Sequence, residues 1–298
     1  MNVDRLLEGS IDMHLHPSPD VSPRCVDFLE ASRQALQARM KAIVIKNHLY
    51  PTAPLATTAN RIVSGIDVFG SICLDYEVGG LNFHALESSA RLGAKVVWMP
   101  TFSSANCRAK VRELLGLPLE GDGFTILDTE GKLVPEINRI LLVIKEYDMI
   151  LASGHMSPSE IFALVEGARK IGIWKLIITH PSEAVGLEEA LTLGDQKRLA
   201  EMGALLEYTA AGLLDPLFGH TPKDVAEDIT AIGAEHVIMS SDLGQKRNPP
   251  PVEGMKMFIS SLLSEGITEG EIEMMVKMNP GKLLDLNEVK AGTTQGEI

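Results

Sequence analysis

The chain has 298 residues, of which 45% are hydrophobic and 22% are charged, as expected for a soluble globular protein with a large core. A formal net charge of −13 argues against nucleic acid, a membrane surface or an acidic molecule as a partner. The three cysteines are too scattered for a disulfide framework, which favours a cytoplasmic location, and we expect neither a secretory signal nor a membrane span.

Eight short apolar runs alternate with segments of helical periodicity. The runs that predict strands cover residues 11–16, 42–46, 67–76, 94–99, 149–153, 175–179, 204–208 and 237–240. The segments that predict helices cover residues 26–40, 85–92, 158–171, 187–202, 222–233, 252–263 and 268–278. Strands that are apolar on both faces indicate a parallel sheet covered on both sides. Eight such units predict an α/β fold, a single (β/α)8 TIM barrel over residues 1–288, with a flexible tail at residues 289–298.

A long interval separates the fourth predicted strand from the fifth and forms an insertion in the barrel. Within it, residues 121–134 are typical of a two-stranded ribbon that turns near residues 129–131. The ribbon is either a lid over an active site or a hairpin without a role. Near the other end of the chain, Thr268 is the predicted N-cap of the last helix. Asn279-Pro280 is predicted to end that helix, because a residue before proline avoids the helical region.

The first predicted strand ends in a pair of histidines. Side chains alternate between the two faces of a strand, so His14 and His16 point the same way. Pro17 cannot donate a hydrogen bond to a sheet and ends the strand just beyond them, at the end where TIM barrels carry their active sites. Two neutral imidazoles side by side form half of a zinc site, whereas two histidines without a role are the competing interpretation.

Three further polar residues directly follow later strands. His155 follows the fifth strand, His180 the sixth and Asp242 the eighth. One such residue is usually a helix cap or a satisfied polar group. Five residues of this kind at the ends of four strands of one barrel indicate a metal site instead.

This constellation resembles the amidohydrolase superfamily of metal-dependent hydrolases, and within it a little-characterised branch. The resemblance implies that His14 and His16 are first-strand metal ligands, that His155 and His180 are the later histidine ligands, and that Asp242 both binds metal and moves protons. A divalent metal lowers the pKa of bound water to about 7, and an adjacent carboxylate can accept its proton. Zinc is the first choice for such ligands, although iron or manganese would also fit.

The fourth strand departs from the superfamily pattern. Members with two metals commonly bridge them through a lysine or glutamate at its end, but residues 96–104 contain neither. We therefore favour one metal ion and keep two as the alternative. Lys46 and His48 are predicted to point together into the barrel mouth. Lys46 is then a carboxylated bridge between metals, a cation that binds a substrate carboxylate or oxyanion, or the partner of Glu77 or Asp75 in an ion pair.

Two other strand ends carry weaker candidates. Glu77 follows the third strand, and Glu207 and Tyr208 end the seventh. Tyr208 either donates to a substrate oxygen or packs against the next loop. The predicted substrate-binding residues are therefore Lys46, His48, Glu77 and Tyr208, and the predicted catalytic residues are Asp242 and Lys46.

The predicted function is hydrolysis of a small-molecule amide, cyclic amide, lactone or ester by metal-activated water. A decarboxylase acting on a small carboxylated substrate is the first alternative, because Lys46 could bind such a carboxylate. A metal-binding barrel without turnover is the second alternative, since a fold alone does not imply catalysis. Homo-oligomerisation is compatible with the sequence.

Overall fold

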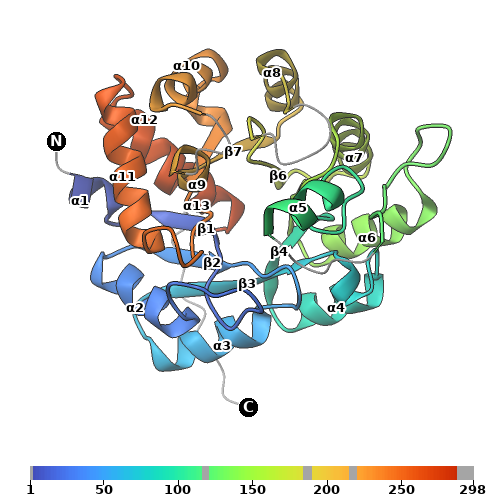
Figure 1. Cartoon of the computed structure of the whole chain (residues 1–298), viewed down its shortest axis with the longest axis horizontal. Helices are drawn as coiled ribbons and strands as arrows, with labels where there is room; N and C mark the ends of the chain where they lie inside the picture. Colours follow the sequence, from blue (N-terminus) through green and yellow to red (C-terminus); the bar gives the residue numbers. More distant parts are fainter. Residues whose placement is uncertain (1–2, 116–120, 184–189, 215–219, 287–298) are drawn as a thin grey trace.

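The protein is a barrel of eight parallel strands surrounded by helices (Figure 1). The computed structural model describes residues 3–115, 121–183, 190–214 and 220–286. The strands follow one another around the barrel in chain order: β1 Ile11–Leu15, β2 Ala42–Ile45, β3 Asp67–Cys73, β4 Ala94–Trp98, β5 Ile150–Ala152, β6 Leu176–Thr179, β7 Leu205–Thr209 and β8 Val237–Ser240. Backbone hydrogen bonds between the end of β1 and the chain after β8 close the ring, with Asp242 N donating to His14 O at 2.7 Å and His16 N to Leu243 O at 2.7 Å.

Helices surround the barrel, and one of them, α13 Asn279–Leu283, packs Leu283 against the apolar cluster inside it. They are α1 Val3–Leu7, α2 Phe28–Gln37, α3 Ala53–Ile62, α4 Phe83–Arg91, α5 Arg108–Leu115, α6 Pro135–Glu146, α7 Pro158–Lys170, α8 Leu193–Glu201, α9 Ala210–Leu214, α10 Pro222–Ile232, α11 Pro251–Ser264, α12 Glu269–Glu273 and α13 Asn279–Leu283. Short 3₁₀ turns lie at η1 Tyr76–Val78 and η2 Ala234–His236, and η3 Met274–Met278 is a π-helix. None of the described helices is both long and apolar enough to cross a membrane.

Strand alternation produces two apolar layers. Met13, Val44 and Val96 belong to a small cluster inside the barrel, whereas their sequence neighbours such as Val97 belong to the large cluster between strands and helices. Full burial of such an aliphatic side chain stabilises the fold by about 1.5–3 kcal/mol. The predicted (β/α)8 barrel is confirmed, because the eight apolar runs form the eight strands.

The structure corrects the prediction for the end of the last helix. Thr268 does cap α12 with a capping box, as expected. The chain does not leave the helical conformation at Asn279, however, but passes through η3 into α13. Pro280 lies in the first turn of α13, where a missing N–H costs no hydrogen bond. The Asn279 amide holds this junction against the barrel by donating to Ala234 O at 2.9 Å and Val237 O at 2.7 Å.

Other boundaries differ in smaller ways. The third strand ends at Cys73, and after two further residues the chain enters η1. The predicted ribbon is reduced to one antiparallel bridge between Leu127 and Leu133. The first turn of the predicted helix over 187–202 and the tail at 289–298 lie outside the described residues. Among the described residues, α3, α5, α6 and α9 lie between strands and have no predicted counterpart, and neither do the short helices α1 and α13.

Candidate metal centre

Three predicted ligands converge at the carboxyl end of the barrel. His14 Nε2 lies 3.2 Å from His16 Nε2, and Asp242 Oδ1 lies 3.1 Å from the former and 2.9 Å from the latter. Both histidines are buried, and the Asp242 side chain is 16% exposed. Such a convergence of acceptor atoms is repulsive unless a positive charge lies among them, and a metal ion is one such charge. The donor set therefore fits a divalent metal.

The backbone holds these ligands close together. The two closing hydrogen bonds between the ends of β1 and β8 bring His14 and His16 against Asp242. Asp242 itself has a positive φ of 50°. Gly244, with φ of +139°, lies so close to β1 that a Cβ there would be 1.9 Å from His16 O. Only glycine fits at this position, and its lack of a side chain allows the segment after β8 to lie against the end of β1.

Glu207 orients His14. Its Oε2 lies 3.1 Å from His14 Nδ1, and both side chains are fully buried. If Nδ1–H donates to this carboxylate, the Nε2 lone pair faces Asp242 and is available to a metal. Glu207 was predicted only to end the seventh strand, and not to bind metal or substrate. Alternation along β7 could have identified it, because an inward Glu207 implies an outward Tyr208.

The charges around His14 favour a cation. Burial alone lowers the pKa of His14, but the carboxylates of Asp242 and Glu207 outweigh it and raise that pKa to about 9. Burial lowers the pKa of His16 well below its usual value. Burial opposes ionisation of Asp242, yet His14 and His16 hold its pKa well below the usual range. Asp242 is thus ionised, and in the metal-free protein the positive charge beside it resides on the His14 imidazole ring.

A second group of potential ligands shares Asp242. His180, Glu183 and Asp242 each offer a ligand atom, and these atoms lie within 4.8 Å of one another. His180 Nδ1 is 3.8 Å from Glu183 Oε2, and Thr209 donates to Glu183 Oε1 at 2.6 Å. Burial lowers the pKa of His180 to about 4. Glu183 lies in the turn after β6, where no strand periodicity marks its position, so it was not predicted.

His155 lies beside this group rather than within it. Its ring centroid is 5.0 Å from that of His180, and its Nδ1 lies 3.5 Å from Cys107 Sγ. Burial lowers the pKa of His155 well below its usual value. Of the predicted metal ligands, His14 and His16 thus form one group with Asp242, and His180 belongs to a second group that also contains Asp242. His155 lies beside these groups and belongs to neither.

Lys46 and His48 do point together into the barrel mouth. Lys46 Nζ lies 2.9 Å from His14 Nε2 and 5.0 Å from the Trp98 ring centroid, and Lys46 is only 1% exposed. It forms an ion pair with neither Glu77 nor Asp75 within the described residues, so the ion-pair interpretation fails.

A hydrogen-bonded chain fixes His48. Thr101 Oγ1 lies 2.7 Å from His48 Nδ1 and donates to Asp75 Oδ2. Asp75 also accepts from the backbone N–H groups of Thr101 at 2.9 Å and Ser103 at 2.8 Å. Phe102 stacks on the His48 ring with a centroid distance of 3.7 Å. His48, Cys73 and Asp75 are close enough to hold a metal, but the Asp75 oxygens already have these donors.

Two predicted substrate-binding residues do not reach the cluster. Glu77 lies on η1 and is exposed, because the chain leaves the strand conformation before it. Tyr208 points outward from β7 into the helix layer, where its hydroxyl lies 2.6 Å from Gln196 Oε1 and 3.2 Å from Asp228 Oδ2. Its packing role corrects the expectation of a substrate contact.

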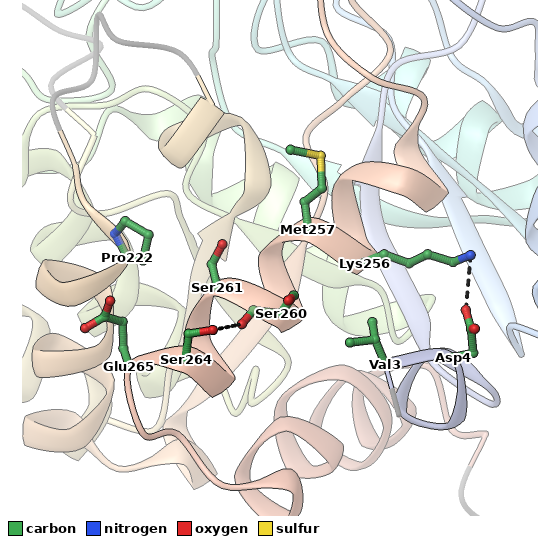
Figure 2. Close-up of a pocket in the computed structure, with 9 residues that line it drawn as sticks. All are labelled: Val3, Asp4, Pro222, Lys256, Met257, Ser260, Ser261, Ser264 and Glu265. Atoms are coloured by element: carbon green, nitrogen blue, oxygen red, sulfur yellow. Dashed lines mark hydrogen bonds and ion pairs between the residues drawn. The ribbon is translucent and has the colours of Figure 1, made fainter. Parts of the chain in front are cut away.

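A groove on the outer surface offers a contrasting environment (Figure 2). It lies along α11 beside α1, and Lys256 at one end of it forms an ion pair with Asp4 at 3.1 Å. Ser264 donates to the backbone carbonyl of Ser260 at 2.9 Å. Lys256 and Ser264 of this groove thus already have polar partners within the protein, unlike the converging acceptor atoms at the carboxyl end of the barrel.

Comparison with solved structures reveals the same fold in several enzymes. An amidohydrolase from Pseudomonas aeruginosa matches with a TM-score of 0.64 and 11% identity over 95% of this chain and 98% of that one. The metallopeptidase dipeptidase AC matches with a TM-score of 0.64 and 12% identity over 93% and 98%. The 2,6-dihydroxybenzoate decarboxylase from Rhizobium matches with a TM-score of 0.53 and 12% identity over 94% and 100%.

These neighbours are amidohydrolase-superfamily enzymes, so the resemblance predicted from the motifs is confirmed at the level of the fold. None of the curated proteins matches this sequence. A family model does match, over residues 9–207, a range that contains His14, His16, His155, His180 and Glu207. Because this range covers more than half of the chain, the protein belongs to the family of unknown function DUF6282.

Proposed function

We propose that this protein is a metal-dependent hydrolase that acts on a small-molecule amide, cyclic amide, lactone or ester. The observation that carries the proposal is the convergence of His14 Nε2, His16 Nε2 and Asp242 Oδ1 at the carboxyl end of the barrel. The similarity of the fold to a metallopeptidase supports it. Zinc is the first choice of metal for two imidazoles and a carboxylate.

The metal would be held by His14, His16 and Asp242. When bound, it supplies a Lewis acid that makes water reactive near neutral pH. Asp242 is ionised and partly exposed, so it can accept a proton from water and return it to a leaving group. Glu207 keeps the His14 ring in the orientation that presents Nε2.

Lys46 and His48 would bind the substrate. Lys46 provides a buried cation beside His14, suited to a substrate carboxylate or oxyanion. The contact of His48 with Thr101 leaves its other ring nitrogen for a substrate polar group. The same buried cation favours the second candidate function, decarboxylation of a small carboxylated substrate, and a decarboxylase shares the fold.

An Asp242→Asn variant tests the mechanism. Turnover of esters, lactones and amides is measured for the wild type and the variant, after reconstitution with Zn²⁺. Loss of the proton acceptor is expected to reduce turnover by about 10²–10⁴-fold. Asp67→Asn is the matched control, because Asp67 is exposed at the opposite end of β3. Wild-type turnover in Asp242→Asn would remove this residue from the mechanism.

Isotope labelling separates the two candidate functions. Hydrolysis in H₂¹⁸O places one ¹⁸O atom in the product acid. Decarboxylation releases carbon dioxide from the substrate without that incorporation. Release of carbon dioxide together with a product that carries no ¹⁸O would replace the hydrolase proposal by the decarboxylase.

A further inference from the structure

We propose that Asp75 and Thr101 hold His48 in the tautomer whose Nε2 accepts a hydrogen bond, so that the substrate carries an N–H group beside the bond that is hydrolysed. The inference rests on the proposed function and narrows its substrate to a secondary amide, open or cyclic, because the ester and lactone linkages have no such donor. Asp75 and Thr101 are positioning residues in this proposal, since they act through His48 and do not touch the substrate.

Asp75 sets the direction of the hydrogen bonds. Its Oδ1 accepts from the backbone N–H groups of Thr101 at 2.9 Å and Ser103 at 2.8 Å, and its Oδ2 accepts from the Thr101 hydroxyl. Burial raises the pKa of Asp75, whereas these three hydrogen bonds and the charge of Lys46 oppose that rise. Three converging donors are the environment of an ionised carboxylate, which can only accept. The single hydroxyl proton of Thr101 is therefore committed to Asp75.

His48 must then donate to Thr101. Thr101 Oγ1 lies 2.7 Å from His48 Nδ1, and with its proton given to Asp75 it can only accept there. Nδ1 thus carries the ring proton. Burial and the charge of Lys46 lower the pKa of His48 well below its usual value, so the ring is neutral and Nε2 keeps a lone pair. A metal ion at His16 would add positive charge nearby and disfavour a cationic His48 further.

The accepting nitrogen belongs to a ring beside the candidate metal ligands. The His48 ring stacks on Phe102 at a centroid distance of 3.7 Å and on His16 at 4.9 Å. His48 is only 5% exposed, and its Nε2 has no hydrogen-bond partner among the described residues. A buried acceptor without a partner is costly, and a substrate N–H would remove that cost. Because His16 is a candidate metal ligand, that N–H would lie close to the reacting carbonyl.

Lys46 offers the opposite polarity on the same side of the barrel mouth. Its Nζ, 2.9 Å from His14 Nε2, is a donor with no carboxylate partner in the described part of the chain. An amide presents both a carbonyl acceptor and an N–H donor, whereas an ester presents only acceptors. The donor of Lys46 and the acceptor of His48 are therefore complementary to an amide.

Nuclear magnetic resonance tests the tautomer without an activity assay. Nitrogen-15 spectra of the full chain loaded with Zn²⁺ distinguish protonated from unprotonated ring nitrogens, and His48→Gln identifies the His48 signals. We expect the proton on Nδ1 in the wild type and in Thr101→Ser, which keeps the hydroxyl. In Thr101→Val the Nε2–H form should appear, because Nδ1 loses its acceptor. A proton on Nε2 in the wild type, or an unchanged tautomer in Thr101→Val, would overturn the inference.

Matched substrates test what the accepting nitrogen selects. Each pair consists of a secondary amide and the ester in which oxygen replaces N–H, and each substrate is compared with its own wild-type rate so that intrinsic reactivity cancels. Thr101→Val should lower kcat/KM for the amide about 2–10-fold, the loss of one neutral hydrogen bond, without a loss for the ester. Thr101→Ser should restore the amide rate. Thr58→Val, the same change at an exposed threonine on α3, should alter neither rate.

The outcomes separate this inference from the proposed function. Equal losses for amide and ester in Thr101→Val would show a purely structural role for Thr101 and overturn the inference alone. No turnover of either substrate by the wild type would overturn the proposed function and, with it, the inferred substrate class. If Thr101→Val fails to fold, the wild-type spectrum decides the question by itself.

Discussion

The Gly154→Ala substitution should destabilise the protein by an amount that the structure determines. Gly154 joins β5 to His155 and has a φ of +63°. A Cβ there would lie 2.4 Å from Met99 O and 2.6 Å from Pro100 O, which are backbone atoms that cannot turn aside. The left-handed conformation costs an alanine about 1–2 kcal/mol, and forced overpacking adds about 1–3 kcal/mol. We expect a total loss of about 2–5 kcal/mol.

Gly131→Ala separates the two contributions. Gly131 has a similar φ of +76°, but nothing lies within 4 Å of its Cβ position. This control should lose only the conformational part, about 1–2 kcal/mol. Urea unfolding followed by circular dichroism measures both variants against the wild type. Equal losses in the two variants would refute the argument that the end of β4 blocks a side chain at Gly154.

Three further substitutions test contacts outside the metal centre. Tyr208→Phe should cost about 0.5–1.5 kcal/mol in urea unfolding through its lost hydroxyl contact with Gln196, and an unchanged free energy of unfolding would contradict its packing role. Thr221→Ala removes the capping box of α10 and should cost about 1 kcal/mol by thermal melting; an unchanged melting temperature would contradict this. Glu160→Gln weakens the acceptor that binds Ile126 N at 2.8 Å, so limited proteolysis within residues 121–134 should accelerate, whereas an unchanged rate would show that other contacts hold this segment.

The strands were predictable because burial on both faces leaves a continuous apolar signature. The same period of two correctly placed Lys46 and His48 inside the barrel. The helix α3 escaped prediction, because its buried face consists of small alanines, Ala53, Ala56 and Ala59, instead of large apolar side chains. Its place is nevertheless fixed by close packing, since a Cβ on Gly70 would lie 2.4 Å from Ala53 Cα.

Candidate ligands on strands were easier to identify than those in turns. The histidines at 14, 16, 155 and 180 follow apolar runs that mark their position on the barrel. Glu183 acquires its position from the turn after β6 and from Thr209, a residue 26 positions away. Such a contact depends on tertiary structure and leaves no local periodicity in the sequence. Tyr208 shows the converse, because a polar residue at a strand end can face the helices.

The closing seam between β1 and β8 also determines when the proposed metal site can form during synthesis. His14 and His16 leave the ribosome long before Asp242, which is separated from His14 by 228 positions in the chain. The nascent histidines therefore lack their carboxylate partner until nearly the whole barrel has been made. Contacts of such long sequence separation form late in folding. Tight metal binding at the proposed site would thus report completion of the ring, and a metal-sensitive probe on a stalled nascent chain would time that event.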